Sequence, residues 1–216
     1  MLAAKRMIPP KIPIFPLPNV VLFPKVLLPL HIFEPRYRTM VEDALAADRI
    51  IGMVLLRPGF EANYEGRPPV YPVGCAGTIT HAERLEDGRF NIVLRGTEKF
   101  RIAGEDVSRD YRLARIEAIA EREDDADVTA MNQQRQRLVG ILKTILTRLG
   151  SEARFPPDLS DEELVNGFAQ NLDLDAIERQ ALLERPGVLS RCRALADLLE
   201  MKAHAAPGGS DGNALH

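Results

Sequence analysis

The sequence has few cysteines and lacks the residue spacing that holds metal ions. Its 216 residues include two cysteines, Cys75 and Cys192, which lie far apart and belong to no C-x-x-C pair. Disulfide frameworks and zinc knuckles need paired or regularly spaced cysteines, so neither is predicted. The histidines also show no ligand spacing; they are His31, His81, His204 and His216. We therefore expect no metal, no cofactor and a reducing compartment.

Long apolar runs are missing as well. No stretch approaches the roughly 18 apolar residues that a membrane-spanning helix needs. The N-terminal segment MLAAKRMIPPKIPIF carries two early cations, but prolines interrupt it before a long apolar run develops. Such a segment differs from a secretory signal peptide. These absences predict a cytoplasmic protein that makes no membrane contact.

Neither sign of charge dominates the chain. The net charge is -3, with 27% of residues charged and both signs mixed. Arginines and aromatic rings do lie close together in the first half, and such residues can stack on and neutralise single-stranded RNA. Acidic residues are interleaved with them, however, and reduce the local field that phosphate binding requires. Nucleic acid is therefore a disfavoured partner, and RNA binding is kept as the alternative function.

The common catalytic motifs are absent. The sequence contains no G-x-x-x-x-G-K-[ST] phosphate loop, no G-x-G-x-x-G turn and no H-E-x-x-H zinc helix. Gly208, Ser210 and Gly212 match G-x-S-x-G, but they lie in a terminal tail and not in the strand-to-helix turn that this motif requires. We predict that the chain is not an enzyme.

Short apolar runs, separated by proline, glycine and charged turns, fill the first half of the chain. They predict strands at residues 12–15, 25–33, 49–56, 74–85, 89–96, 98–105 and 111–119. An Asp-Gly pair at residues 87–88 predicts a hairpin turn. The prolines of the first strands are expected to confine them to edges, bulges or strand ends, because proline donates no hydrogen bond; they are Pro16, Pro18, Pro24 and Pro29.

A helix is predicted to begin near Pro35, because apolar residues then recur with helical spacing up to Leu45. Residues 57–73 are rich in proline and glycine, so they are predicted to form a long loop. Long loops in compact domains are often functional.

The second half has helical periodicity almost throughout. A long helix is predicted from residue 128 to Gly150, and Ser160 with Glu163 forms a capping box for a second helix at residues 161–171. Asp173 is predicted to cap a third helix that ends at Arg185, and a fourth follows at residues 188–203. The fold class is therefore α+β. The predicted parts are a β-rich subdomain at residues 1–122, a helical subdomain at 123–206 and a disordered tail at 207–216.

Three blocks carry a family resemblance. They are IPIFPLPNVVLFPKVLLPLHIFEPRYRTMVEDAL at residues 12–45, VGCAGTITHAERLEDGRFNIVLRGTEKFRI at 73–102 and LLERPGVLSRCRALADLLE at 182–200. In this order they resemble the N-terminal, substrate-binding domain of Lon protease. The resemblance implies a β-rich, PUA-like subdomain followed by a C-terminal α-helical bundle.

The resemblance also implies a function. Lon proteases carry an ATPase module and a Ser-Lys peptidase module, and the motifs of both are missing from this sequence. What is implied is a non-enzymatic module that binds unfolded or exposed apolar protein segments, with a separate ATPase or protease as a candidate partner. The oligomeric state stays open. Aromatic and arginine side chains on and beside the loop at 57–73 are the predicted peptide-binding residues, because such side chains dominate protein interfaces; they are Phe33, Arg36, Phe60, Tyr64 and Tyr71.

Overall fold

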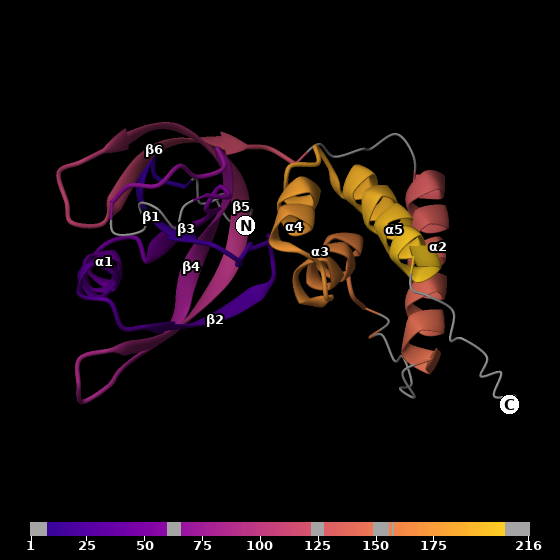
Figure 1. Cartoon of the computed structure of the whole chain (residues 1–216), viewed down its shortest axis with the longest axis horizontal. Helices are drawn as coiled ribbons and strands as arrows, with labels where there is room; N and C mark the ends of the chain where they lie inside the picture. Colours follow the sequence, from indigo (N-terminus) through magenta and orange to yellow (C-terminus); the bar gives the residue numbers. More distant parts are fainter. Residues whose placement is uncertain (1–7, 60–65, 122–127, 149–155, 157, 206–216) are drawn as a thin grey trace, which may run out of the picture.

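The computed structural model describes residues 8–59, 66–121, 128–148, 156 and 158–205. A six-stranded sheet lies at one side of the molecule and four helices lie at the other, so the fold class is α+β as predicted (Figure 1). Within these residues, no helix has the length and apolar content of a bilayer span.

The elements follow one another along the chain in two groups. The first is β1 (Lys11–Leu17), β2 (Leu27–Ile32), α1 (Pro35–Ala46), β3 (Ile50–Leu55), β4 (Val73–Arg84), β5 (Phe90–Asp106) and β6 (Arg112–Ile119). The second is α2 (Val128–Arg148), α3 (Asp161–Asn171), α4 (Ala176–Leu183) and α5 (Val188–Ala205).

The sheet closes on itself through its longest strand. The strand order is β2-β5-β4-β3-β1-β6, and β5 pairs with β6 as well. The first half of β5 pairs with β2 and its second half with β6, with a register shift between Ile102 and Gly104. The sequence predicted two separate strands here, at residues 89–96 and 98–105, and this was wrong, because β5 runs unbroken from Phe90 to Asp106. Gly96 instead lets two segments approach closely, since a Cβ there would lie 2.0 Å from the carbonyl oxygen of Phe23.

The prolines obey the expected rule in two different ways. Pro29 lies on β2, which pairs on one side only, as predicted for an edge strand. β1, in contrast, lies between β3 and β6. It pairs with β6 through Lys11–Ile14 and with β3 through Ile14–Leu17. Pro16 therefore falls in a half of the strand that pairs on one side only, and a missing N–H leaves no ladder bond unmade.

Most local predictions in the first half are confirmed. Helix α1 begins at Pro35 and buries Tyr37, Met40, Val41 and Ala44. Every residue of β3 is buried. The hairpin between β4 and β5 turns at Gly88, whose φ of 79° lies in the left-handed region that glycine tolerates best.

The helical half needs one correction. Ser160 and Glu163 form the predicted capping box, and α3 spans the predicted residues. The cap of α4, however, is Asp175 and not Asp173, and α4 ends at Leu183 instead of Arg185. The backbone N–H of Asp175 donates to Glu178 at 2.8 Å. A capping box needs an acid or amide three residues after the cap, and only Asp175 has one.

Several predictions lie outside the described residues. These are the end of the long helix at Gly150, the boundary between residues 122 and 123, and the tail at 207–216. The division into two subdomains therefore stays a prediction. A single cluster of buried apolar residues runs from the sheet, through Phe23, to Leu164 and Leu195 of the helices.

Buried polar side chains join the helices to the sheet. The guanidinium of Arg191 on α5, which is 0% exposed, donates to Asn166 on α3 at 2.6 Å and to Glu121 after β6. Lys99 on β5, which is 1% exposed, lies 3.0 Å from the same Glu121 oxygen. Two buried cations therefore share one carboxylate, a cluster that we call the Glu121 latch (Lys99, Glu121 and Arg191).

Candidate functional site

The free edge of β2 is the main open feature of the sheet. Among the described strands, β2 alone pairs with a single other strand, so one of its edges is open along its whole length. The carbonyl oxygen of Leu27 accepts from the Gln170 side chain at 3.0 Å, so it points away from β5. Because backbone groups alternate along an antiparallel pair, those of Pro29 and His31 also face outward. We call residues 27–33 on this side the β2 edge.

Large apolar side chains mark both ends of the β2 edge. Leu27 is 56% exposed and Phe33 is 61% exposed. Phe33 stacks near the ring of His31, with centroids 6.4 Å apart. Exposed large apolar side chains at a strand edge favour association with another chain.

A groove of about 210 Å³ lies where the β2 edge meets the helices. Leu28 and Pro29 of β2 line one side, and Asn171 and Arg179 line the other. Arg179 donates to the carbonyl of Leu172 at 3.0 Å, and its Nε is buried without a hydrogen-bond partner among the described residues. The groove is thus apolar along the strand and carries a cation on the helical side.

Gln170 fixes the width of this groove. Its amide nitrogen donates to the carbonyl of Leu27, and its amide oxygen accepts from the backbone N–H of Phe23 at 3.0 Å. On the neighbouring turn of α3, Asn166 donates to the carbonyl of Pro24 at 3.0 Å. The end of α3 is therefore tied to the segment that leads into β2.

The predicted site residues divide into three groups. Phe33 is exposed at the β2 edge, and Arg36 follows it on the first turn of α1. Arg36 bonds Glu34 at 3.0 Å, and its guanidinium carbon lies 4.7 Å from the centroid of the Tyr37 ring. Tyr71 is half-buried and packs against the core. Phe60 and Tyr64 lie outside the described residues.

The structure places Arg36 beside the predicted loop but does not gather all the predicted residues in one cavity. Arg36 lines a cavity of about 180 Å³ together with Gly66 and Arg67, which belong to the loop at 57–73. Phe33 and Tyr71 do not line this cavity. These five residues stay a prediction as a peptide-binding set.

Sequence reasoning missed the residues of the groove. Leu27 and Leu28 lie far from Arg179 in the chain, and no local pattern joins β2 to α4. One signal was present, since Pro29 predicts an edge strand and edges are where extended peptides add.

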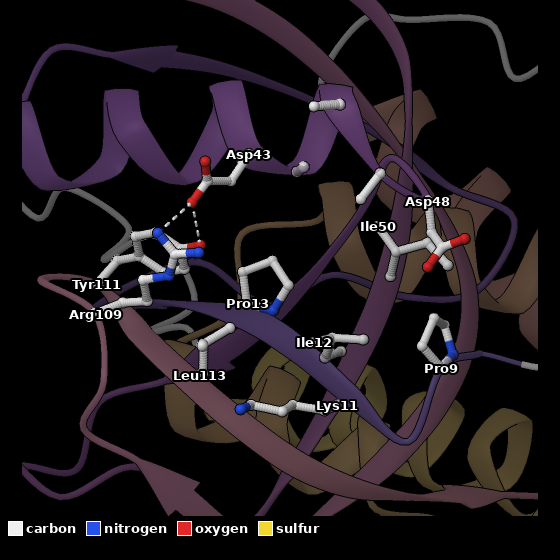
Figure 2. Close-up of a pocket in the computed structure, with 13 residues that line it drawn as sticks. Pro9, Lys11, Ile12, Pro13, Asp43, Asp48, Ile50, Arg109, Tyr111 and Leu113 are labelled. Atoms are coloured by element: carbon white, nitrogen blue, oxygen red, sulfur yellow. Dashed lines mark hydrogen bonds and ion pairs between the residues drawn. The ribbon is translucent and has the colours of Figure 1, made fainter.

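A second and larger cavity, of about 400 Å³, lies between α1, β1 and β6 (Figure 2). At one end Tyr111 donates its O–H to Asp43 at 2.7 Å, and Arg109 lies 3.6 Å from the same carboxylate oxygen. Burial, together with the hydrogen bond to Asp43, raises the pKa of Tyr111 to about 12. The phenol is therefore protonated at neutral pH, where it acts as a hydrogen-bond donor and not as a base.

The two thiols have no features of a nucleophile. Cys75 and Cys192 are both buried. Burial raises the pKa of the Cys75 thiol far above its usual range and raises that of Cys192 to about 11. A protonated, buried thiol is a poor nucleophile. Across the described part of the chain, no three His, Cys, Asp or Glu side chains are grouped so that they could hold a metal ion.

Comparison with known proteins gives the family. Residues 11–201 match the family model described as the ATP-dependent protease La (LON) substrate-binding domain. The chain is 30% identical over 191 residues to Lon protease 2 of Syntrophobacter fumaroxidans, covering 84% of this chain and 23% of the relative. It is 28% identical over 211 residues to the Lon protease of Anaeromyxobacter dehalogenans, and this match covers 94% of this chain and 24% of that relative. The chain thus spans about a quarter of the length of these relatives.

Solved structures show the same fold. The N-terminal domain of Mycobacterium avium complex Lon protease superposes with a TM-score of 0.64 at 16% identity, covering 88% of this chain and 98% of that one. A Lon N-terminal domain protein from Xanthomonas campestris gives a TM-score of 0.56 at 23% identity, and the match covers 88% of this chain and 97% of that one. With the family model matching nearly the whole described chain, this protein belongs to the family of Lon substrate-binding domains.

Proposed function

We propose that this chain is a non-enzymatic protein-binding module that binds extended, apolar segments of unfolded proteins along the β2 edge. One observation carries the proposal: in a family of substrate-binding domains, β2 is the one described strand that pairs with a single other strand, so one edge is unpaired along its whole length, and exposed Leu27 and Phe33 lie at its two ends. A separate ATPase or protease is the partner that would process the bound chain. The cytoplasmic location stays a prediction.

Strand addition explains how such an edge binds many sequences. An extended peptide uses its own backbone to pair with outward N–H and C=O groups, and its side chains enter neighbouring pockets. On the β2 edge, Pro29 has no N–H to donate and the carbonyl of Leu27 is already bound to Gln170. Few main-chain bonds therefore remain, and the apolar contacts contribute most of the binding energy. We expect micromolar affinity, about -8 kcal/mol.

The predicted site residues extend this surface at one end. Phe33 is the apolar contact at the end of β2, and Arg36 is the cation that follows it. A bound segment that continued past Phe33 would reach the cavity of Arg36 and the end of the loop at 57–73. Phe60, Tyr64 and Tyr71 are the proposed contacts on that loop.

Binding of a permanently unfolded probe tests the proposal. Reduced and carboxymethylated α-lactalbumin, labelled with a fluorophore, is titrated with the protein and followed by anisotropy, with native α-lactalbumin as the folded control. We expect the unfolded probe alone to bind. Leu27→Ser and Phe33→Ser should each weaken binding about five- to ten-fold, as expected when an exposed contact worth more than about 1 kcal/mol is lost.

Val107→Ser is the matched control. Val107 is 76% exposed in the turn between β5 and β6, away from the β2 edge, so its replacement should leave the affinity unchanged. Equal affinities for wild type, Leu27→Ser and Phe33→Ser would refute the β2 edge as the site. The RNA alternative is separated by salt: single-stranded RNA bound through phosphates would dissociate steeply as salt rises, whereas apolar peptide binding would change little.

A further inference from the structure

The 400 Å³ cavity between α1, β1 and β6 has the properties of a ligand site, and no residue of the β2 edge lines it (Figure 2). Its volume lies within the range of small-molecule pockets, which are mostly apolar with a few polar groups. Ile12, Pro13, Ile50 and Leu113 supply apolar lining. Asp43, Arg109 and Tyr111 lie at one end and Asp48 lies at the other, while Lys11 lies below Ile12 and Leu113 in the view (Figure 2).

The cations of this cavity are already paired. Lys11 forms an ion pair with Asp106, and Arg109 lies 3.6 Å from Asp43. Asp48 differs, because it is exposed and has no ion pair or hydrogen bond to any residue that the structure describes. After these two ion pairs are counted, the carboxylate of Asp48 is the one lining charge without a described counter-charge, and it lies at the end of the cavity opposite Asp43.

The end around Asp48 presents hydrogen-bond acceptors. It is formed by the C-terminal turn of α1, whose last carbonyls lack helical partners and form the negative end of the helix dipole. No basic side chain compensates them in the last turn. The N–H groups of Ala47 and Arg49 both donate to the carbonyl of Ala44, at 3.1 and 2.9 Å. The neighbouring wall includes Pro9, which has no N–H.

We propose that this cavity binds an ammonium or guanidinium group on an aliphatic stem, which is the chemistry of a lysine or arginine side chain. The stem lies on Ile12, Ile50 and Leu113, and the cationic head meets Asp48 and the end of α1. Ammonium and guanidinium groups carry only donors, so they complement a surface of acceptors. An anion would meet Asp48 and the negative helix end. A neutral apolar ligand would leave both without a partner.

Amide chemical shifts measured by NMR during titration with n-butylammonium chloride test the inference. We expect saturable shifts at Ala46, Ala47 and Ile50, with a dissociation constant in the millimolar range. n-Butanol has the same stem without the charge and should bind about five-fold more weakly, the usual upper size of a partly exposed ion pair. Sodium chloride at equal ionic strength controls for salt.

Variants locate the charge that matters. Asp48→Asn should weaken n-butylammonium binding about five-fold, because it removes the unpaired carboxylate. Glu117→Gln makes the same charge change at an exposed position of β6 that does not line the cavity, and it should leave binding unchanged. Equal binding of n-butanol, or an unchanged affinity in Asp48→Asn, would overturn the inference.

Two peptides identify the source of the cation. A blocked Ala-Ala-Lys-Ala-Ala peptide is compared with its norleucine counterpart. Shifts at the same amides with the lysine peptide alone assign the site to a side chain of a bound polypeptide. Binding of n-butylammonium but of neither peptide assigns it to a free small amine. These outcomes do not depend on the β2 edge, so the two sites can fail separately.

Discussion

Replacing Glu121 by glutamine should be among the most damaging single changes to this fold. One oxygen of this carboxylate accepts from Arg191 and lies 3.0 Å from the ammonium of Lys99. Both cationic side chains are almost completely buried, at 0% and 1% exposure, and Glu121 itself is 21% exposed. The substitution keeps the shape of the side chain and removes its charge. Two buried cations are then left without their counter-charge.

The magnitude follows from the cost of an uncompensated buried charge. Removing one partner of a buried ion pair typically costs about 3–5 kcal/mol, which is a large part of the roughly 5–15 kcal/mol that stabilises a domain. We expect Glu121→Gln to lower the free energy of unfolding by that amount at neutral pH. Lys99→Met should cost only about 1 kcal/mol. That variant loses the 2.6 Å hydrogen bond to the carbonyl of Arg185 but leaves one cation facing one carboxylate.

The loss should also depend on pH. Burial, together with the charge of Arg191, lowers the pKa of Lys99 below the value of 10.5 that it has when exposed. Between its folded and unfolded pKa values, the unfolded chain binds more protons, so the free energy of unfolding rises with pH. Without the Glu121 charge the pKa of Lys99 falls further. The gap between wild type and Glu121→Gln should therefore narrow as the pH rises from neutral toward about 10.

Urea titration followed by circular dichroism is the appropriate assay, because urea does not screen charge as guanidinium salt does. Glu117→Gln on the exposed face of β6 is the matched control and should stay within about 0.5 kcal/mol of wild type. A loss below about 1 kcal/mol in Glu121→Gln, or an equal loss in Lys99→Met, would contradict the argument that the latch depends on its shared carboxylate.

Three further changes test other parts of the fold. Ser160→Ala removes the side chain that caps α3 and should cost about 1 kcal/mol in urea titration; an unchanged midpoint would show that the cap contributes nothing. Gly74→Ala places a Cβ 2.4 Å from the backbone oxygen of Met53 and should cost about 1–3 kcal/mol or more, so a variant as stable as wild type would contradict the close approach. Cys75 and Cys192 are buried with raised pKa values, so neither should react with a thiol reagent until urea unfolds the chain, and rapid reaction of the native protein would refute this.

Local patterns in the sequence were sufficient for most of the elements. The Asp-Gly turn, Pro35 at the start of α1 and the Ser160 capping box each depend on residues within one turn of one another, and all three are confirmed. The cap of α4 was predicted at Asp173, which is followed three residues later by Ala176; Asp175 has Glu178 at that spacing and is the cap.

The predictions that failed or were missed concern contacts between distant segments. The sequence divided residues 89–105 into two strands, whereas β5 continues through Gly96, which approaches the Phe23 backbone too closely for a side chain. The groove beside β2 depends on Arg179, which lies about 150 positions after Leu28 in the chain. No spacing rule relates such positions, since their proximity is set by how α3 and α4 pack against the sheet.

That docking is set by hydrogen bonds as well as by apolar contact, and this has a consequence for function. Apolar surfaces can slide against each other at little cost, because the hydrophobic effect is not directional. Asn166 and Gln170, in contrast, each bond a particular backbone group near the start of β2. Arg191 holds Asn166 from the other side and is itself held by Glu121. A chain of polar contacts thus runs from the end of β6 to the β2 edge. The groove should therefore keep a fixed width, with apolar residues along the strand and Arg179 on the helical side, which suits the proposed binding of many sequences in one extended conformation.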